Sequence, residues 1–351
     1  MVRTLENIKP TKEGRIYKSK SHEKLTSAEV GKLWVTYMGN SMSRCVLSYL
    51  LRHVDDQEIK QVLEQALSLS EEFVRICKDK FVQDNHPVPI AFSLEEDTNL
   101  ESTRLFEDEF YLHYLKYIAK AGLSIYGIAI PLVTRPDVRE FFTYVIDSTV
   151  RLLNQVNEIM MAKGVLIRPP YIPTPKHVEF VKKNSYLNGF FGNIRTLHAL
   201  EITHLYDNVQ NIVTSRAVLM AFKQGVKTPR IQEYMRRGEQ IATKHFEIFS
   251  QYLAKENLAA LPLLNHLVTD STTAPFSEKL MVFHKLDMFS MRMRSYANAM
   301  AVNGRHDIAA AYARLLVEVG NYAEDGVNIM IDNGWMEEPP HAANRDDLES
   351  R

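Results

Sequence analysis

A glutamate and a histidine three residues apart, in Glu201-Ile-Thr-His204, form the clearest metal-binding pattern of this chain. In a four-helix bundle, a carboxylate-bridged di-metal centre takes one Glu from each of two helices and a Glu-x-x-His pair from each of the other two. The chain has one such pair on a predicted helix, where the full centre needs two. A single-ion site would therefore need ligands from other helices.

Further imidazole and carboxylate groups lie in the second half of the chain. When the predicted helices of that half are laid antiparallel by the positions of their loops, these groups fall at two levels. The candidates at the first level, near Asn208, are His204, His245 and Glu318, and those at the second level are Glu239, His284, Asp287 and Glu324. Either level could hold one ion with nitrogen and oxygen ligands, so iron, manganese or zinc is the cofactor hypothesis.

A structural interpretation of the same residues is favoured. Glu201 follows a helix start by three residues and is explained as a capping residue, and Arg216 could neutralise Glu239 or Asp287. Six of the candidates correspond to other residue types in the first half of the chain, namely Lys32, Phe73, Tyr114, Tyr117, Ser148 and Asn154. The fold does not require the candidates, so we expect no cofactor and keep metal binding as the alternative.

The sequence pattern of the elements that position these residues occurs twice in the chain. Val327-Asn-Ile-Met-Ile-Asp-Asn-Gly-Trp-Met-Glu-Glu-Pro-Pro340 repeats the pattern of Asn157-Glu-Ile-Met-Met-Ala-Lys-Gly-Val-Leu-Ile-Arg-Pro-Pro170. Each stretch predicts a helix end, a glycine in the left-handed conformation and a double proline that stops the helix. Leu25 returns as Leu197 and Phe106 as Phe276, so the offset is 172 residues at first and 170 later. The pattern indicates a tandem duplication.

Each half predicts four amphipathic helices and no strand. In the first half they cover about 26–51, 56–86, 106–130 and 134–164, with a capping box at Thr26-Ser-Ala-Glu29. Two short loops and one long crossing, at about 93–103, are the connectivity of a ferritin-like bundle. The predicted fold is therefore all-α, with two tandem ferritin-like four-helix bundles.

Proline-rich sequence separates the two predicted bundles and is expected to be extended and stiff. The predicted organisation is an N-terminal tail at 1–24, bundle 1 at 25–166, a linker at 167–190, bundle 2 at 191–337 and a C-terminal tail at 338–351. The apolar turn Gly189-Phe-Phe-Gly192 is expected to dock onto a bundle, and Trp34 and Trp335 are expected to anchor helix ends.

Composition indicates an ordinary soluble protein. The 351 residues carry a formal net charge of −1, which gives no bulk attraction to nucleic acid. The longest uncharged apolar run, 121–134, is too short to span a membrane, and the N-terminus lacks the apolar core of a signal peptide. Cys45 and Cys77 are expected to be reduced, buried thiols. A cytoplasmic location is therefore predicted.

Several stretches of the chain are similar to a known family. They are His198-Ala-Leu-Glu-Ile-Thr-His-Leu-Tyr206, Val268-Thr-Asp-Ser-Thr272, Lys279-Leu-Met-Val-Phe-His284 and Tyr322-Ala-Glu-Asp-Gly-Val-Asn-Ile-Met330. The chain resembles an uncharacterised family of tandem ferritin-like bundles from spore-forming bacilli, some of whose members are labelled spore coat proteins by similarity to the coat F group. The first half departs from this pattern at Thr26, where the second half has His198.

The resemblance implies a non-catalytic structural or interaction protein of a spore-forming bacterium, with a spore-coat association. Protein partners or self-association are then expected, and no small-molecule substrate is identified. The alternative is a metal-binding or metal-dependent redox protein with its site in the second bundle. A third hypothesis is a small apolar ligand held between helices of either bundle.

Overall fold

The computed structural model describes residues 23–345, which form long helices in two similar sets of four. The first set is α1 (Ser27–His53), α2 (Gln57–Gln83), α4 (Asp108–Ala129) and α5 (Pro136–Ala162), with the short α3 (Leu94–Asp97) in its crossing. The second set is α6 (Ala199–Gly225), α7 (Pro229–Lys255), α8 (Glu278–Ala301) and α9 (His306–Asp332), with the 3-10 turns η1 (Asn184–Leu187) and η2 (Asn265–Leu267). The predicted all-α fold with a duplicated bundle is confirmed.

Helix positions follow the duplication residue by residue. α1 and α6 begin at residues 27 and 199, an offset of 172, whereas α5 and α9 begin at 136 and 306, an offset of 170. Gly164 and Gly334 follow the last helix of each set with φ of 70° and 67°, the left-handed conformation that ends a helix without strain in glycine. The expected boundaries of the helices are therefore confirmed to within a few residues.

The capping glutamates also join helices. Glu29 completes the capping box with Thr26, and its Oε1 accepts from the backbone N–H groups of Thr134 and Arg135, both at 2.8 Å. Glu201 forms the same box with His198 and accepts from Gly304 N at 3.1 Å. Each carboxylate thus fixes the first helix of its set to the start of the last helix, as its capping role predicts.

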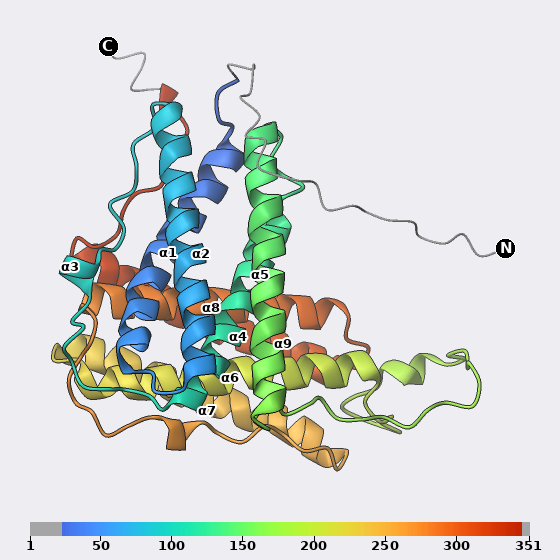
Figure 1. Ribbon diagram of the computed structural model, residues 1–351. Helices are drawn as coiled ribbons and strands as arrows, with labels where there is room; N and C mark the ends of the chain where they lie inside the picture. Colours follow the sequence, from blue (N-terminus) through green and yellow to red (C-terminus); the bar gives the residue numbers. More distant parts are fainter. Residues whose placement is uncertain (1–22, 346–351) are drawn as a thin grey trace.

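The two sets of helices pack against each other along one junction. In Figure 1 the second set lies across the lower part of the first, and α4 contacts both α6 and α8. One apolar cluster runs continuously through this junction, and a second cluster, which includes Phe81 and Phe142, fills the far end of the first set. The core around α4 and α8 is therefore shared by both sets.

The two long crossings pair with each other in antiparallel fashion. Thr98 bridges Phe276, and Phe106 bridges Val268. With the offset of 170, residue 98 corresponds to 268 and residue 106 to 276, so each bridge is the symmetry partner of the other. The backbone bonds agree, because Glu107 N donates to Leu267 O and Ser277 N donates to Asp97 O, both at 3.0 Å. The two units are thus related by an approximate two-fold axis through this ladder.

The segment after each last helix crosses to the other unit. After α5, Ile167 O accepts from Tyr206 Oη on α6 at 2.6 Å. After α9, the Glu337 carboxylate accepts from Ile90 N at 2.8 Å, beyond the end of α2. Trp34 on α1 and Trp335 after α9 both pack against the shared core. Each unit is therefore joined to the other by the segment that follows its last helix.

The linker 167–190 leaves the bundles, and Figure 1 shows it looping away from the helices. Phe190 and Phe191 are 58% and 86% exposed, so the two rings do not pack onto a bundle, whereas Gly189 of the same turn lies directly against Asp307 at the start of α9. Most of the predicted tails, residues 1–22 and 346–351, lie outside the described residues. Cys45 and Cys77 are buried and unpaired, and no helix within 23–345 is long and apolar enough to cross a membrane.

Candidate functional site

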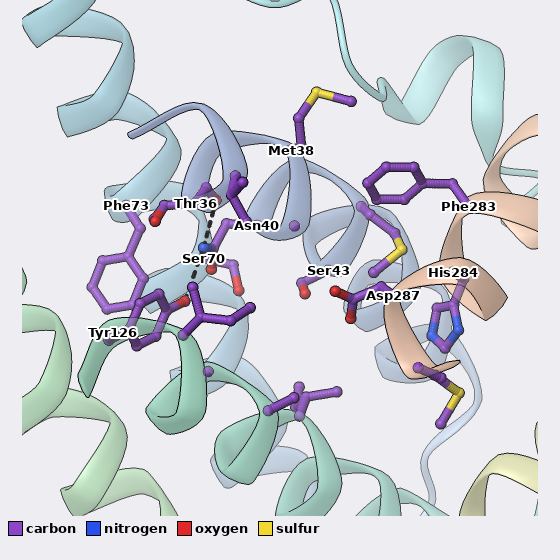
Figure 2. Close-up of a pocket in the computed structure, with 18 of the residues that line it drawn as sticks. Thr36, Met38, Asn40, Ser43, Ser70, Phe73, Tyr126, Phe283, His284 and Asp287 are labelled. Atoms are coloured by element: carbon purple, nitrogen blue, oxygen red, sulfur yellow. Dashed lines mark hydrogen bonds between the residues drawn. The ribbon is translucent and has the colours of Figure 1, made fainter. Parts of the chain in front are cut away.

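A cavity of about 240 Å³ lies inside the first bundle where it meets α8 of the second. Its walls come from α1, α2, α4 and α5, from α8, and from the segment 335–337 that follows α9. Most of the lining is apolar or aromatic, as Figure 2 shows for Phe73, Met38 and Phe283. A largely apolar pocket with a few polar groups is the usual form of a small-molecule site.

Two acidic residues line this cavity, and Asp287 is the one whose carboxylate has no bond to another residue of the described chain, whereas Glu337 binds the N–H groups of Ile90 and Ala91. Asp287 comes from α8, and Figure 2 shows it turned toward the Ser43 hydroxyl of α1. Neither side chain has a hydrogen-bond or ion-pair partner within residues 23–345. Burial raises the pKa of Asp287, and the positive charges of Arg294 and Lys285 lower it only in part. An acceptor and a hydroxyl from different units therefore face the same space without satisfying each other.

His284 lies one helical turn before Asp287 on the same wall. The side chain is 2% exposed, and its Nε2 is 2.7 Å from Tyr114 Oη on α4. Burial, with the neighbouring charge of Lys285, lowers the pKa of His284 to about 3, so the imidazole is neutral at physiological pH. Its Nδ1 is buried and has no partner in the described chain. His284 therefore adds a neutral hydrogen-bonding side chain, and no positive charge, to the wall of the cavity.

The opposite end of the cavity is held in place by Asn40. Its Nδ2 donates to Thr36 O at 2.8 Å and to Tyr126 Oη at 3.2 Å, and Figure 2 shows this pair of bonds beside Phe73. The amide fixes the tyrosine ring that closes the cavity between α1 and α4. Burial raises the pKa of Tyr126 to about 12, so its hydroxyl stays neutral.

The mouth of the cavity carries the segment after α9. Trp335, Met336 and Glu337 line it, and the Glu337 carboxylate binds the N–H groups of Ile90 and Ala91 at 2.8 and 2.5 Å. Ala91 has a φ of 56°, and in this left-handed conformation its N–H points to the Glu337 carboxylate. The second unit thus supplies the segment 335–337 and both acidic residues, Asp287 and Glu337, to a cavity in the first unit.

The predicted first level of ligands is partly assembled. His245 is fully buried, with Nδ1 2.9 Å from Tyr296 Oη and Nε2 3.2 Å from Glu318 Oε2. Lys244 Nζ already donates to both Glu318 oxygens at 2.9 Å. Burial and the charge of Arg292 lower the pKa of His245 to about 4. His204 is half-buried, and the structure shows no bond between its ring and this pair.

The four residues predicted for the second level do not lie together in the structure. His284 and Asp287 line the cavity, whereas Glu239 pairs with Arg216 at 3.2 Å and also with Lys223. Glu324 is exposed on α9. Within residues 23–345 no three His, Cys, Asp or Glu side chains are grouped closely enough to hold a metal ion. Of the predicted candidates, His284 and Asp287 are the two that line the cavity between the first bundle and α8.

The sequence analysis missed the first-unit residues of the cavity. Ser43, Asn40 and Tyr114 were not considered as site residues, because each bundle was searched by itself and the site lies where two bundles meet. A usable signal was present in the repeat comparison. His284 and Asp287 replace Tyr114 and Tyr117, so the second unit differs from the first in polarity on one face of one helix.

Comparison with known proteins supports the duplication. A family model described as "Protein of unknown function (DUF3231)" matches the chain twice, over residues 16–178 and 185–348. No curated protein matches the chain. Among solved structures, a protein of Bacillus halodurans described as "putative spore coat protein" is similar at 19% identity and a TM-score of 0.40. The match covers 43% of this chain and 98% of that one.

Proposed function

Because the chain belongs to the DUF3231 family, whose function is unknown, we propose from its geometry that it is a non-catalytic binding protein. It takes a small, mostly apolar molecule into the cavity between α1, α4 and α8. The observation that carries this proposal is the cavity of about 240 Å³ with a mostly apolar lining and one acid from the other unit, Asp287, that is unpaired in the described chain. Close packing usually leaves few voids larger than a water molecule, so a space of this size is itself informative.

Filling the cavity tests this function. Gly39 lines the cavity on α1, and a Cβ added there meets no atom within 4 Å. We expect indole at millimolar concentration to raise the melting temperature of the wild-type protein, because a ligand that binds the folded state stabilises it. Gly39→Leu should abolish this rise. Gly31→Leu, on the same helix and equally free of contacts but exposed, should keep it. No response in the wild type, or the same response in Gly39→Leu, would contradict the proposal.

A structural or interaction role, with the spore-coat association implied by the sequence resemblance, is the second candidate. Its support is the linker and the turn that follows it, where Tyr171, Val178, Phe180 and Phe191 are 80%, 87%, 84% and 86% exposed. Large apolar side chains gathered on one exposed segment favour protein contacts.

A second copy of the chain is the partner that fits this segment. Antiparallel pairing of two copies centred between Phe180 and Val181 places Glu179 of each opposite Lys182 of the other. Cross-strand pairs of opposite charge are stabilising, and such a contact is closed by two-fold symmetry. The two candidate functions use different surfaces and are compatible.

A metal-dependent role is the third candidate, with iron, manganese or zinc as the ion. Its support is the pair His245 and Glu318, whose Nε2 and Oε2 atoms are 3.2 Å apart. Imidazole nitrogen with carboxylate oxygen suits these metals. This candidate requires the metal ion to displace the Lys244 ammonium group from the Glu318 carboxylate.

A further inference from the structure

A contact in the second unit indicates which chemical group fits beside Ser43 in the cavity of the first unit. With the offset of 172, Ser43 of the first unit corresponds to Ser215 of the second. Lys285 is fully buried beside Ser215, and its Nζ donates to Ser215 Oγ at 2.9 Å and to Ser215 O at 3.0 Å. In the second bundle an amino group that donates hydrogen bonds therefore occupies the place beside this serine.

The first bundle lacks that amino group. The position of Lys285 corresponds to Leu115, so nothing charged reaches Ser43 from α4. The Ser43 hydroxyl instead faces the Asp287 carboxylate across open space in the cavity (Figure 2). Asp287 is half-buried and has no partner among the described residues, and an opposite charge bound beside a carboxylate that is partly removed from water offsets the cost of that removal. The first bundle thus has the acceptors for an ammonium group and no ammonium of its own.

The walls fit an apolar body attached to such a group. Trp34, Tyr117 and Tyr126 line the cavity together with methionines such as Met42. Aromatic faces attract an organic cation, and methionine adapts to an irregular apolar shape. The neutral His284 adds no positive charge that would repel it.

We propose that the cavity binds a primary amine with an apolar or aromatic body, with its ammonium group between the Asp287 carboxylate and the Ser43 hydroxyl. This inference rests on the proposed function, because it names the class of ligand for the same cavity. A charge-assisted bond to the carboxylate supplies most of the selectivity, and the apolar walls supply affinity that does not depend on charge.

Two probes of nearly equal shape test the assignment on the full chain. Isothermal titration calorimetry at pH 7 compares 2-phenylethylamine, which is protonated, with the neutral 2-phenylethanol. We expect the amine to bind at least about 10-fold more tightly than the alcohol. Asp287→Asn should remove that preference and leave the affinity for the alcohol unchanged. Glu324→Gln, which removes an exposed carboxylate outside the cavity, should change neither affinity.

The outcomes separate this inference from the function on which it rests. If both probes bind equally and Gly39→Leu abolishes both, the cavity function stands and the amine assignment is overturned. The same conclusion follows if Asp287→Asn retains the preference for the amine. If neither probe binds the wild-type protein, the cavity function fails together with the assignment. Should Asp287→Asn fail to fold, Ser43→Ala replaces it, with a weaker preference for the amine expected and an unchanged preference contradicting the proposal.

Discussion

Tyr114 and His284 occupy the same position of the two repeated units, and they meet. The offset of 170 relates the two residues, and Tyr114 Oη lies 2.7 Å from His284 Nε2 at the junction of α4 and α8. Two equivalent positions can touch only close to the axis that relates the units. This contact therefore marks the centre of the molecule, where a change in one unit acts directly on the other.

Removing the Tyr114 hydroxyl should weaken this junction. Tyr114→Phe leaves His284 Nε2 buried without a partner, which costs about 1–3 kcal/mol of unfolding free energy. Urea denaturation measures the loss. Tyr144→Phe, whose hydroxyl bonds Glu72 on the partly exposed side of the first bundle, is the matched control and should cost less. An equal or smaller loss in Tyr114→Phe would contradict the central role of the contact.

Acid should destabilise the protein through Glu29. Burial opposes ionisation of this carboxyl, but hydrogen bonds from Thr26, Arg135 and Thr134 outweigh it and lower its pKa to about 2. A lowered pKa in the folded state gives stability that is present above the unfolded value of 4.5 and is lost as pH falls toward 2.

Glu29→Gln tests this contribution. We expect the variant to be less stable at pH 7 by about 2 kcal/mol and to lose less stability than the wild type between pH 4.5 and 2. Thermal unfolding followed by circular dichroism at each pH provides the measurement. The exposed Glu64→Gln on α2 should match the wild type. A parallel pH profile for Glu29→Gln would show that the cap is not the acid-sensitive group.

Lys285 should limit stability near neutral pH. It is fully buried without an acidic partner in the described chain, and burial lowers its pKa well below 10.5. Below pH 10.5 the folded state then binds fewer protons than the unfolded state, so its stability rises as pH increases toward 10.5. Lys285→Met keeps the length of the side chain, removes the charge, and should flatten that rise and be neutral or stabilising at pH 7. Denaturation at pH 7 and 9 measures both effects, with the exposed Lys78→Met as control.

Metal should not stabilise the protein. Lys244 already neutralises Glu318, so His245 has no free carboxylate with which to share an ion. We expect zinc, iron or manganese to leave the melting temperature unchanged. Stoichiometric metal in protein purified without chelator, lost in His245→Ala, would instead favour the metal-dependent candidate.

Self-association should depend on the linker. Replacing Phe180 and Phe191 with serine should reduce the mass observed by sedimentation equilibrium at high protein concentration, because it removes exposed apolar contacts. Val317→Ser changes an apolar side chain that is 64% exposed on α9, and it should have no effect. A wild-type protein that stays monomeric throughout the concentration series would contradict the second candidate function.

The sequence predicts the helices well because their signals are local. Thr26 and Glu29 indicate a helix start and Gly164 indicates a helix end, because capping depends on backbone conformation and hydrogen bonds within a few residues. Because the sequence is duplicated, each helix of one half is also predicted from the corresponding stretch of the other half. The site depends instead on contacts between residues far apart, such as Ser43 and Asp287, and helical periodicity carries no information about them.

The metal hypothesis shows the same limit. Levels assigned from loop positions brought His245 and Glu318 together correctly, because the two helices are antiparallel neighbours in one bundle. The same reasoning did not place Asp287, which points away from its own bundle into the cavity of the other. The orientation of that residue is set by the packing of the two units, which no motif in the chain describes.

The pairing of the two crossings has a consequence for how the molecule behaves on dilution. The ladder that carries the bridges of Thr98 and Phe106 resembles a dimer contact, yet both strands belong to one polypeptide. Its formation is therefore intramolecular, and the junction keeps its strength at any protein concentration. A true homodimer must also place identical side chains at equivalent positions, whereas a tethered pair is free to set a tyrosine against a histidine and so to build one asymmetric chamber.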